Sequence, residues 1–267
     1  LIEELAQNCS CPISVQPNAG MPKLVDGETI FPMTPEEMAS YVPALVQAGA
    51  TYIGGCCGTT PAHIAAVSTI AKTLAPIVRQ QKKQVLALTS RSKTVFIGKD
   101  EPTVIIGERI NPTGRKKLAA DIKEGNFMSV KKEALEQVQA GAHILDVNMG
   151  VGGIDQAAAM NKAITEISQL VAVPLAIDTS DTKALEAGLK AYPGRALINS
   201  VSAEPERLTE FLPLAKKYGA AILCLPIASD VPRTAPARVA IIKTIVNAAK
   251  KIGLTDTDFL LDALVMT

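Results

Sequence analysis

Short apolar runs recur along this chain with helical patterns between most of them, and this alternation is the strongest constraint on its fold. The runs are continuous instead of alternating with polar residues, which is typical of strands buried on both faces of a parallel sheet. The sequence therefore predicts an α/β protein. The predicted strands lie at residues 13–15, 52–53, 104–106, 144–147, 175–177, 196–198, 222–225 and 259–261.

Helix start and stop signals support this division. Thr34 precedes Pro35 and Glu37, which predicts an N-cap, a proline at the first helical position and a capping-box glutamate. Thr60 and Pro61 repeat the first two of these signals. Each of three glycines is expected to end a helix, because each follows a helical pattern. These glycines are at positions 141, 219 and 253.

The composition argues against a nucleic-acid or membrane partner. The 267 residues include 27 Lys plus Arg against 26 Asp plus Glu, so no basic surface is expected. Aromatic residues make up only 3%, which is few for a base-stacking surface. The longest stretch without a charge, residues 38–71, is interrupted by prolines and glycines, so a membrane helix is not expected there. Small molecules or other proteins are the expected partners.

The first residues and the cysteines indicate what kind of protein the chain comes from and where in the cell we expect it. The first residues lack an initiator Met and the pattern of a signal peptide, so we expect a chain that begins within a longer protein. Five cysteines, two of them adjacent, do not resemble a disulfide framework. The expected location is the reducing cytoplasm.

A basic segment divides the predicted strands into two groups. Residues 76–103 lose the strand and helix alternation, and we interpret them as a solvated linker, with an interaction surface as the alternative. Two strands precede this linker and six follow it, whereas a TIM-type (β/α)8 barrel needs eight. We therefore expect two incomplete barrels, in residues 1–75 and 104–267. At least two further strand-helix units are expected after the last residue.

A glycine-rich segment carries two adjacent cysteines at a strand end. In residues 54–61 the order is Gly-Gly-Cys-Cys-Gly-Thr-Thr-Pro. The glycines permit an irregular backbone that turns both Cys56 and Cys57 toward one metal, for which zinc is the natural candidate. The alternative is that both cysteines are small buried hydrophobes, and the pattern alone does not decide between the two.

This segment resembles the end of the zinc-dependent homocysteine S-methyltransferase domain, and residues 16–22 resemble the loop that precedes it. The resemblance implies that Cys56 and Cys57 are two of three zinc thiolates and that Asn18 binds homocysteine. In that family the third cysteine lies on an earlier strand, which we expect upstream of Leu1. Cys9 and Cys11 precede the strand at residue 13 and are expected at its opposite end, away from the metal.

Polar residues follow or end most of the later strands. In parallel strands these positions meet at one edge, where α/β barrels carry their active sites. Carboxylates and amides together fit a flat heterocycle with an aminopyrimidine edge, since Asp accepts from N–H groups and Asn both donates and accepts. The alternative is that each residue caps a helix or forms a turn. The residues are Asn111, Asp146, Asn148, Asp178, Asn199 and Asp262.

Residues 106–117 resemble the opening of a methyltetrahydrofolate-binding pterin domain, and the strand ends after it follow in that family's order. The resemblance implies that Asp178, Asn199 and Asp262 hydrogen-bond the pterin ring. Asn111, Asp146 and Asn148 are further candidate pterin-binding residues because of their positions near the same strand ends. The match at Asp262 departs from the family, because Ala263 stands where a proline is usual.

The order of the two segments resembles the cobalamin-dependent methionine synthases. This resemblance implies methyl transfer from 5-methyltetrahydrofolate to homocysteine, zinc as a cofactor, and methylcobalamin carried on a cobalamin-binding domain elsewhere in the protein. The chain alone is expected to be inactive. The alternatives are another corrinoid-linked pterin methyltransferase, a dihydropteroate synthase-like enzyme, and a non-catalytic binding module. Residues 110–114 lack the Asn-Val-Thr-Pro-Asp-Ser-Phe type of loop expected of a dihydropteroate synthase.

Overall fold

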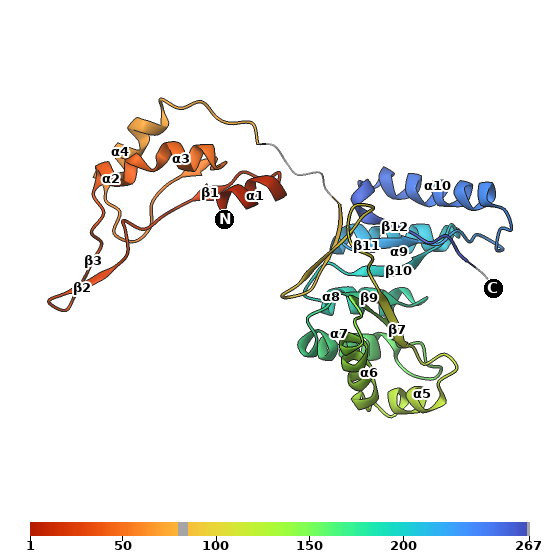
Figure 1. Cartoon of the computed structure of the whole chain (residues 1–267). Helices are drawn as coiled ribbons and strands as arrows, with labels where there is room; N and C mark the ends of the chain where they lie inside the picture. The colour runs from red at the N-terminus through yellow and green to blue at the C-terminus, as the bar shows by residue number, and fades with distance from the viewer. Residues whose placement is uncertain (80–84, 266–267) are drawn as a thin grey trace. The chain divides into compact units, whose positions relative to one another are not determined.

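The computed structural model describes residues 1–79 and 85–265. The chain divides into two compact units, Leu1–Gln84 (unit 1) and Val85–Thr267 (unit 2), which are described separately below (Figure 1). No helix in the described part of the chain combines the length and the apolar composition needed to cross a membrane.

Unit 1 contains a short parallel pair of strands, as the apolar runs predicted. β1 (Ser14–Val15) pairs with β4 (Tyr52–Ile53). The small core of this unit joins Met38, Val42 and Val67. The helices are α1 (Ile2–Asn8), α2 (Pro35–Ser40), α3 (Val42–Gln47) and α4 (Pro61–Ala71).

An antiparallel hairpin in unit 1 was not predicted. It joins β2 (Lys23–Val25) to β3 (Glu28–Ile30). Its turn consists of Asp26 and Gly27, both with positive φ, at 52° and 83°. Asp-Gly is a common pair in two-residue turns of this kind, because such turns need left-handed backbone at both positions.

Unit 2 is built on one parallel sheet of six strands, which confirms the α/β class and the six later strands. The spatial order is β12-β11-β10-β9-β8-β7, so each strand lies beside the strand that precedes it in the chain. Among the described residues, the first and last strands each pair on one side only. The strands are β7 (Ile106–Ile110), β8 (Ile144–Asn148), β9 (Leu175–Asp178), β10 (Leu197–Val201), β11 (Ala221–Cys224) and β12 (Phe259–Leu261).

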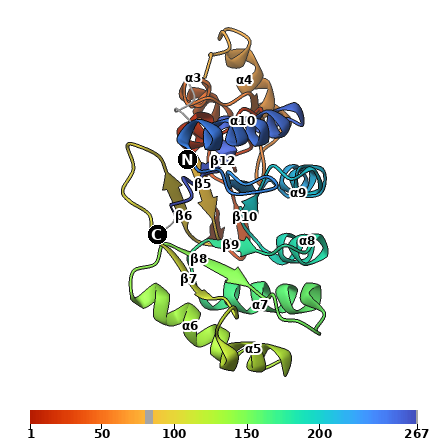
Figure 2. The ribbon, with the colours of Figure 1, turned by 90° about the vertical axis from the view of Figure 1, so that its right-hand side faces the viewer.

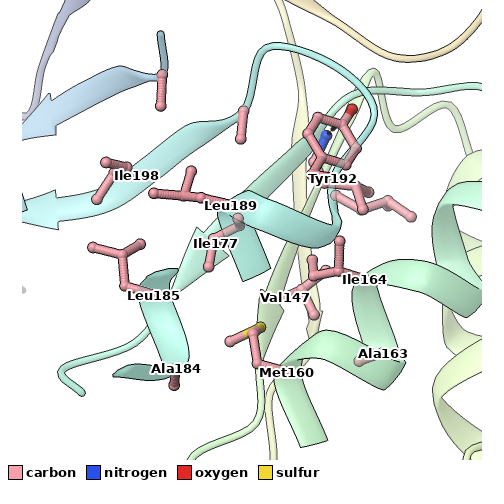
Figure 3. Close-up of a cluster of buried hydrophobic side chains, with 14 of the residues drawn as sticks. Val147, Met160, Ala163, Ile164, Ile177, Ala184, Leu185, Leu189, Tyr192 and Ile198 are labelled. Carbon is pink, nitrogen blue, oxygen red and sulfur yellow. Dashed lines mark hydrogen bonds between the residues drawn. The ribbon is translucent and has the colours of Figure 1, made fainter. Parts of the chain in front are cut away.

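Helices follow these strands and pack along the sheet, as α7, α8 and α9 do in Figure 2. The main core lies between helices and strands, where Ile164 and Leu185 pack with Val147 and Ile177 (Figure 3). All four of these side chains are fully buried. The helices are α5 (Lys116–Lys123), α6 (Met128–Gln139), α7 (Gln156–Leu170), α8 (Thr182–Ala191), α9 (Pro205–Tyr218) and α10 (Ala235–Lys251), followed by the 3-10 helix η1 (Asp256–Asp258).

The predicted N-caps, first-turn prolines and glycine ends of these helices are confirmed. The Thr34 hydroxyl accepts a hydrogen bond from the Glu37 backbone N–H at 3.1 Å, with Pro35 in the first turn of α2. Thr60 caps α4. Gly141, Gly219 and Gly253 all have positive φ, which glycine adopts without the steric cost of a Cβ.

The expected linker at residues 76–103 is wrong over residues 86–97. These residues form an antiparallel hairpin of β5 (Leu86–Thr89) and β6 (Thr94–Ile97). Leu86, Leu88 and Val95 are buried against the first residues of several strands of the sheet. Side chains that alternate between the two faces of a hairpin can bury one face even when its turn is basic. The covered sheet residues are Ile144, Ala176, Leu197 and Ala221.

Arg195 fastens this hairpin to the rest of unit 2. Its guanidinium donates to the Ala87 and Gly219 carbonyls, both at 3.1 Å, and also forms an ion pair with Asp258. Its backbone N–H donates to the Thr89 hydroxyl at 2.8 Å. One side chain therefore joins β5, the end of α9 and η1.

Replacing Arg195 with Met is expected to lower the free energy of unfolding of unit 2 by about 2–4 kcal/mol, because several charge-assisted hydrogen bonds are lost together. Urea denaturation followed by far-UV circular dichroism measures the change. The exposed Arg233→Met is the matched control and is expected to change stability by less than about 0.5 kcal/mol. Equal stability of the two variants would contradict the fastening role of Arg195.

Candidate functional site

Four of the predicted polar residues lie together at the carboxyl ends of three neighbouring strands. Parallel pairing places Asp178 of β9 opposite Asn148 of β8 and opposite Asn199 of β10. Residues in register on parallel strands point to the same face, so these three side chains form one row. Asp146 lies two residues before Asn148 and faces the same side, one row deeper.

Hydrogen bonds fix the orientation of this cluster. The Asn148 amide nitrogen donates to the Asp178 carboxylate at 2.8 Å, and its oxygen accepts from the Gly150 backbone N–H at 2.7 Å. The Asn199 amide nitrogen donates to the Asp146 carboxylate at 3.0 Å. Each carboxyl group therefore receives one amide donor.

Burial changes the acid strength of both carboxyl groups. Burial raises the pKa of Asp146 to about 7, and the negative charges of Asp178 and Glu108 act in the same direction, while the Asn199 donor opposes them. Burial also raises the pKa of Asp178, against the donor from Asn148. The two carboxyl groups act on each other in opposite directions, because Asp178 raises the pKa of Asp146 whereas Asp146 lowers that of Asp178.

A cavity of about 220 Å³ opens beside the row. Asp178 and Asn199 line it, so their side chains are available to a ligand. Arg207 lies on its wall, where its guanidinium donates to the Ser180 carbonyl at 2.6 Å and stacks on the Phe211 ring. The cavity thus offers carboxylate and amide groups to a flat polar molecule.

Asn111 and Asp262 follow the two outer strands of the sheet, and neither lines this cavity. The Asn111 side chain accepts from the Thr113 backbone N–H at 2.9 Å, and the Asp262 side chain accepts from Leu264 at 2.6 Å. Both side chains therefore stabilise turns, which is the alternative that the sequence left open for each of them.

A partly exposed ion-pair network that the sequence did not indicate supports the loop carrying Asn111. Glu133 of α6 pairs with Arg109 at 3.0 Å and with Arg115. Burial acts to raise the pKa of Glu133, but the two arginines outweigh it and leave this pKa lowered. Gln137, one turn later, accepts from the Arg109 backbone N–H at 2.9 Å, where the pairing of β7 and β8 is irregular. The only trace of this network in the sequence is that Glu133 and Gln137 are spaced to lie on one face of a helix.

In unit 1, Cys56 and Cys57 are exposed, and their sulfur atoms lie 3.8 Å apart. The preceding loop holds this segment, because the Asn18 side chain accepts from the Cys57 backbone N–H at 3.2 Å. The Cys56 N–H donates to the Pro17 carbonyl at 2.9 Å, and Ala19 donates to the Cys57 carbonyl at 2.9 Å. The structure therefore brings together the three residues predicted for zinc and homocysteine.

The cysteine pair fits zinc. Two sulfur atoms on a tetrahedral zinc, with Zn–S bonds of about 2.3 Å, lie about 3.8 Å apart. A hydrogen bond with the Cys56 side chain, and then the charge of that side chain, raise the pKa of Cys57, and a cation held by both sulfur atoms would favour the thiolate form. Within residues 1–79 and 85–265, no group of three or more His, Cys, Asp or Glu side chains gathers to hold a metal.

The other three cysteines and both histidines are either buried or in contact with nearby backbone groups. Cys224 is fully buried, and burial raises its pKa to about 12. The Cys9 sulfur lies 3.8 Å from the Cys11 carbonyl oxygen. His63 uses one ring nitrogen in the cap of α4 and the other to contact the Met33 carbonyl at 2.9 Å. His143 accepts from the Ile105 backbone N–H at 3.0 Å.

Comparisons with known proteins match both units. Residues 107–267 match the family model described as pterin binding enzyme, and residues 1–71 match that of homocysteine S-methyltransferase. Over its whole length the chain is 30% identical to the methionine synthases of Mycobacterium tuberculosis and Mycobacterium leprae. It spans 23% of the length of each of these relatives.

Among solved structures, the chain is similar to the 7,8-dihydropteroate synthase of Vibrio fischeri, with 19% identity, a TM-score of 0.46 and 66% of each chain covered. The Yersinia pestis dihydropteroate synthase gives 18% identity and a TM-score of 0.49, covering 67% of this chain and 65% of that one.

The buried carboxyl pair predicts a pH dependence of stability. Asp146 keeps its proton in the folded chain up to about pH 7, whereas an unfolded Asp loses it near pH 4. Between these values the folded state binds more protons, so Asp146 lowers the free energy of unfolding as pH rises, by at most about 1.4 kcal/mol per pH unit. Urea denaturation from pH 5 to 8 is therefore expected to show wild type losing stability relative to Asp146→Asn, with a constant difference above pH 7. A difference independent of pH would contradict the shifted pKa.

Proposed function

The chain belongs to the family of pterin-binding enzymes, and we propose that unit 2 binds the pterin ring of 5-methyltetrahydrofolate, the methyl donor for homocysteine. The observation that carries this proposal is the row of Asn148, Asp178 and Asn199 beside the 220 Å³ cavity. The 30% identity to methionine synthases over the whole chain supports the choice of donor and acceptor.

The site chemistry fits a pterin. An ionised Asp178 accepts hydrogen bonds from the N–H groups of an aminopyrimidine edge, and the Asn199 amide supplies both an acceptor and a remaining donor. We propose that both residues orient the ring without attacking it, and that Asp262 and Asn111 complete the site at its margins. The bound pterin nitrogen that carries the methyl group must gain a proton or a strong hydrogen bond, because an amine is a poor leaving group.

We propose that unit 1 presents homocysteine. Cys56 and Cys57 would hold zinc, and Asn18 would contact the amino acid. When bound, zinc supplies a Lewis acid that lowers the pKa of the homocysteine thiol. The match of residues 1–71 to homocysteine S-methyltransferase and the 3.8 Å between the two sulfur atoms support this assignment. Asn18 and the Pro17 carbonyl hold the cysteine segment in place through its backbone.

The wider setting is proposed from the relatives. Because the chain spans 23% of their length, we propose that a cobalamin-binding domain lies elsewhere in the protein and that this chain alone does not complete the reaction. Each unit would form part of a (β/α)8 barrel, unit 1 within residues 1–75 and unit 2 from residue 85 onward. Free cysteines support the cytoplasm as its location.

Asp178→Asn is expected to weaken binding of 5-methyltetrahydrofolate at least about tenfold, because a charged acceptor for the pterin N–H groups is lost. Calorimetric titration of the full-length gene product measures the affinity, with the exposed Asp230→Asn as the matched control. Titration with a pterin pyrophosphate tests the dihydropteroate synthase alternative. Equal affinity of wild type and Asp178→Asn for methyltetrahydrofolate would remove Asp178 from the site.

The chain of 267 residues is expected to bind zinc weakly, because two thiolates hold zinc less tightly than three. Competition with a chelator measures the affinity. Cys57→Ser is expected to abolish the remaining binding, while the exposed Cys11→Ser leaves it unchanged. Tight, stoichiometric zinc in the purified wild-type chain would overturn the expectation of a two-thiolate site.

A further inference from the structure

Asp146 is a buried acid with no place among the groups that face the ligand. Its side chain is 2% exposed, and it does not line the cavity that Asp178 and Asn199 line. A carboxyl group at this depth costs free energy unless neighbouring groups satisfy it, so its neighbours indicate its role.

We propose that Asp146 is a positioning residue: it holds Asn199 and Asp178 from behind, in the orientation that binds the ring, without touching the ring. This inference rests on the proposed pterin site. The Asn199 amide nitrogen donates to Asp146 at 3.0 Å. Asp178 follows Ala176, the register partner of Asp146, by two residues on the same face, so the Asp146 carboxyl group also lies beside Asp178. One buried carboxyl group thus lies beside both Asp178 and Asn199, the two proposed pterin-binding residues that line the cavity.

The sheet register explains how Asp146 reaches Asn199 from two strands away. Asp146 of β8 lies opposite Ala176 of β9, and Ala176 lies opposite Leu197 of β10. Asn199 is two residues beyond Leu197, on the same face, so the hydrogen bond between Asn199 and Asp146 passes over Ala176. A side chain larger than alanine at this position would obstruct the contact.

The cluster holds one proton between two acids. The charged groups that face Asp146 are Asp178 from β9 and Glu108 from β7, both acidic, while β10 contributes the neutral Asn199. Glu204 and Arg207 line the cavity beside Asp178. A protonated Asp146 donates to Asp178, so Asp178 stays ionised toward the cavity, and accepts from Asn199 at the same time. Loss of this proton leaves two negative carboxylates in contact and disturbs both ligand-facing side chains.

Three variants test this arrangement in the full-length gene product, with calorimetric titration of 5-methyltetrahydrofolate from pH 6 to 8. Asp146→Asn places a donor and an acceptor where the protonated acid has them. It is expected to match the wild-type affinity at pH 6 and to keep it at pH 8, where wild type becomes weaker. Asp146→Ala and Ala176→Val are each expected to weaken binding about tenfold at pH 6, because Asn199 loses its anchor.

The outcomes separate the positioning role from the pterin site itself. If wild type binds, Asp178→Asn binds weakly and Asp146→Ala binds like wild type, the positioning role is wrong and the pterin site stands. If wild type does not bind or Asp178→Asn changes nothing, the proposed pterin site is wrong. A purely structural Asp146 would give folded variants with lower thermal stability but an unchanged pH profile, and this also overturns the inference.

Discussion

The parallel hydrogen bonds that join each strand to the next, from β7 through to β12, determine where the functional side chains of unit 2 lie. Parallel strands carry their carboxyl ends to one edge, and the register aligns Asn148, Asp178 and Asn199 in a single row. Because the two strands that carry Asn148 and Asn199 both pair with β9, a shift of one residue in either ladder would turn a polar side chain from the cavity into the helix-facing core. The same pairing that stabilises the sheet therefore positions the candidate site.

Along these strands, the face of the sheet that carries Asp146 has apolar side chains near the start of each strand and polar side chains near the end. The first residues of the strands pack against the β5–β6 hairpin, which Arg195 fastens to the body of the unit. Asp146 shares its row with Ala176 and Leu197, which belong to this apolar layer, so its carboxyl group lies where the apolar layer meets the polar row. Its low exposure follows from that intermediate position, because the hairpin side excludes water and the polar row covers it from the other side. The depth of the carboxyl group accounts for its raised pKa.

Sequence reasoning predicted the parallel strands, the helix caps and the polar cluster because each leaves a local pattern. It missed the β5–β6 hairpin, since Arg91 and Lys93 at the turn obscured the alternation of Leu86 and Leu88. The burial of Asp146 had no local signal, because it depends on a small residue on the next strand and on a hairpin about 50 residues earlier. The spacing of the Cys56 and Cys57 sulfur atoms is likewise a property of the folded loop.

The order of the strands has a consequence for how unit 2 is made. Every strand from β8 to β12 pairs with the strand that precedes it in the chain, and at least one helix lies between the two in the sequence. A chain that leaves the ribosome from its amino end can therefore add one strand and one helix at a time to an edge that already exists. Each addition closes a loop of one repeat only, which keeps the entropy cost of each step small. The row of the candidate site needs only β8, β9 and β10, so in such an order of addition it would be complete once β10 pairs with β9 and Asn199 reaches the Asp146 carboxyl group two strands away.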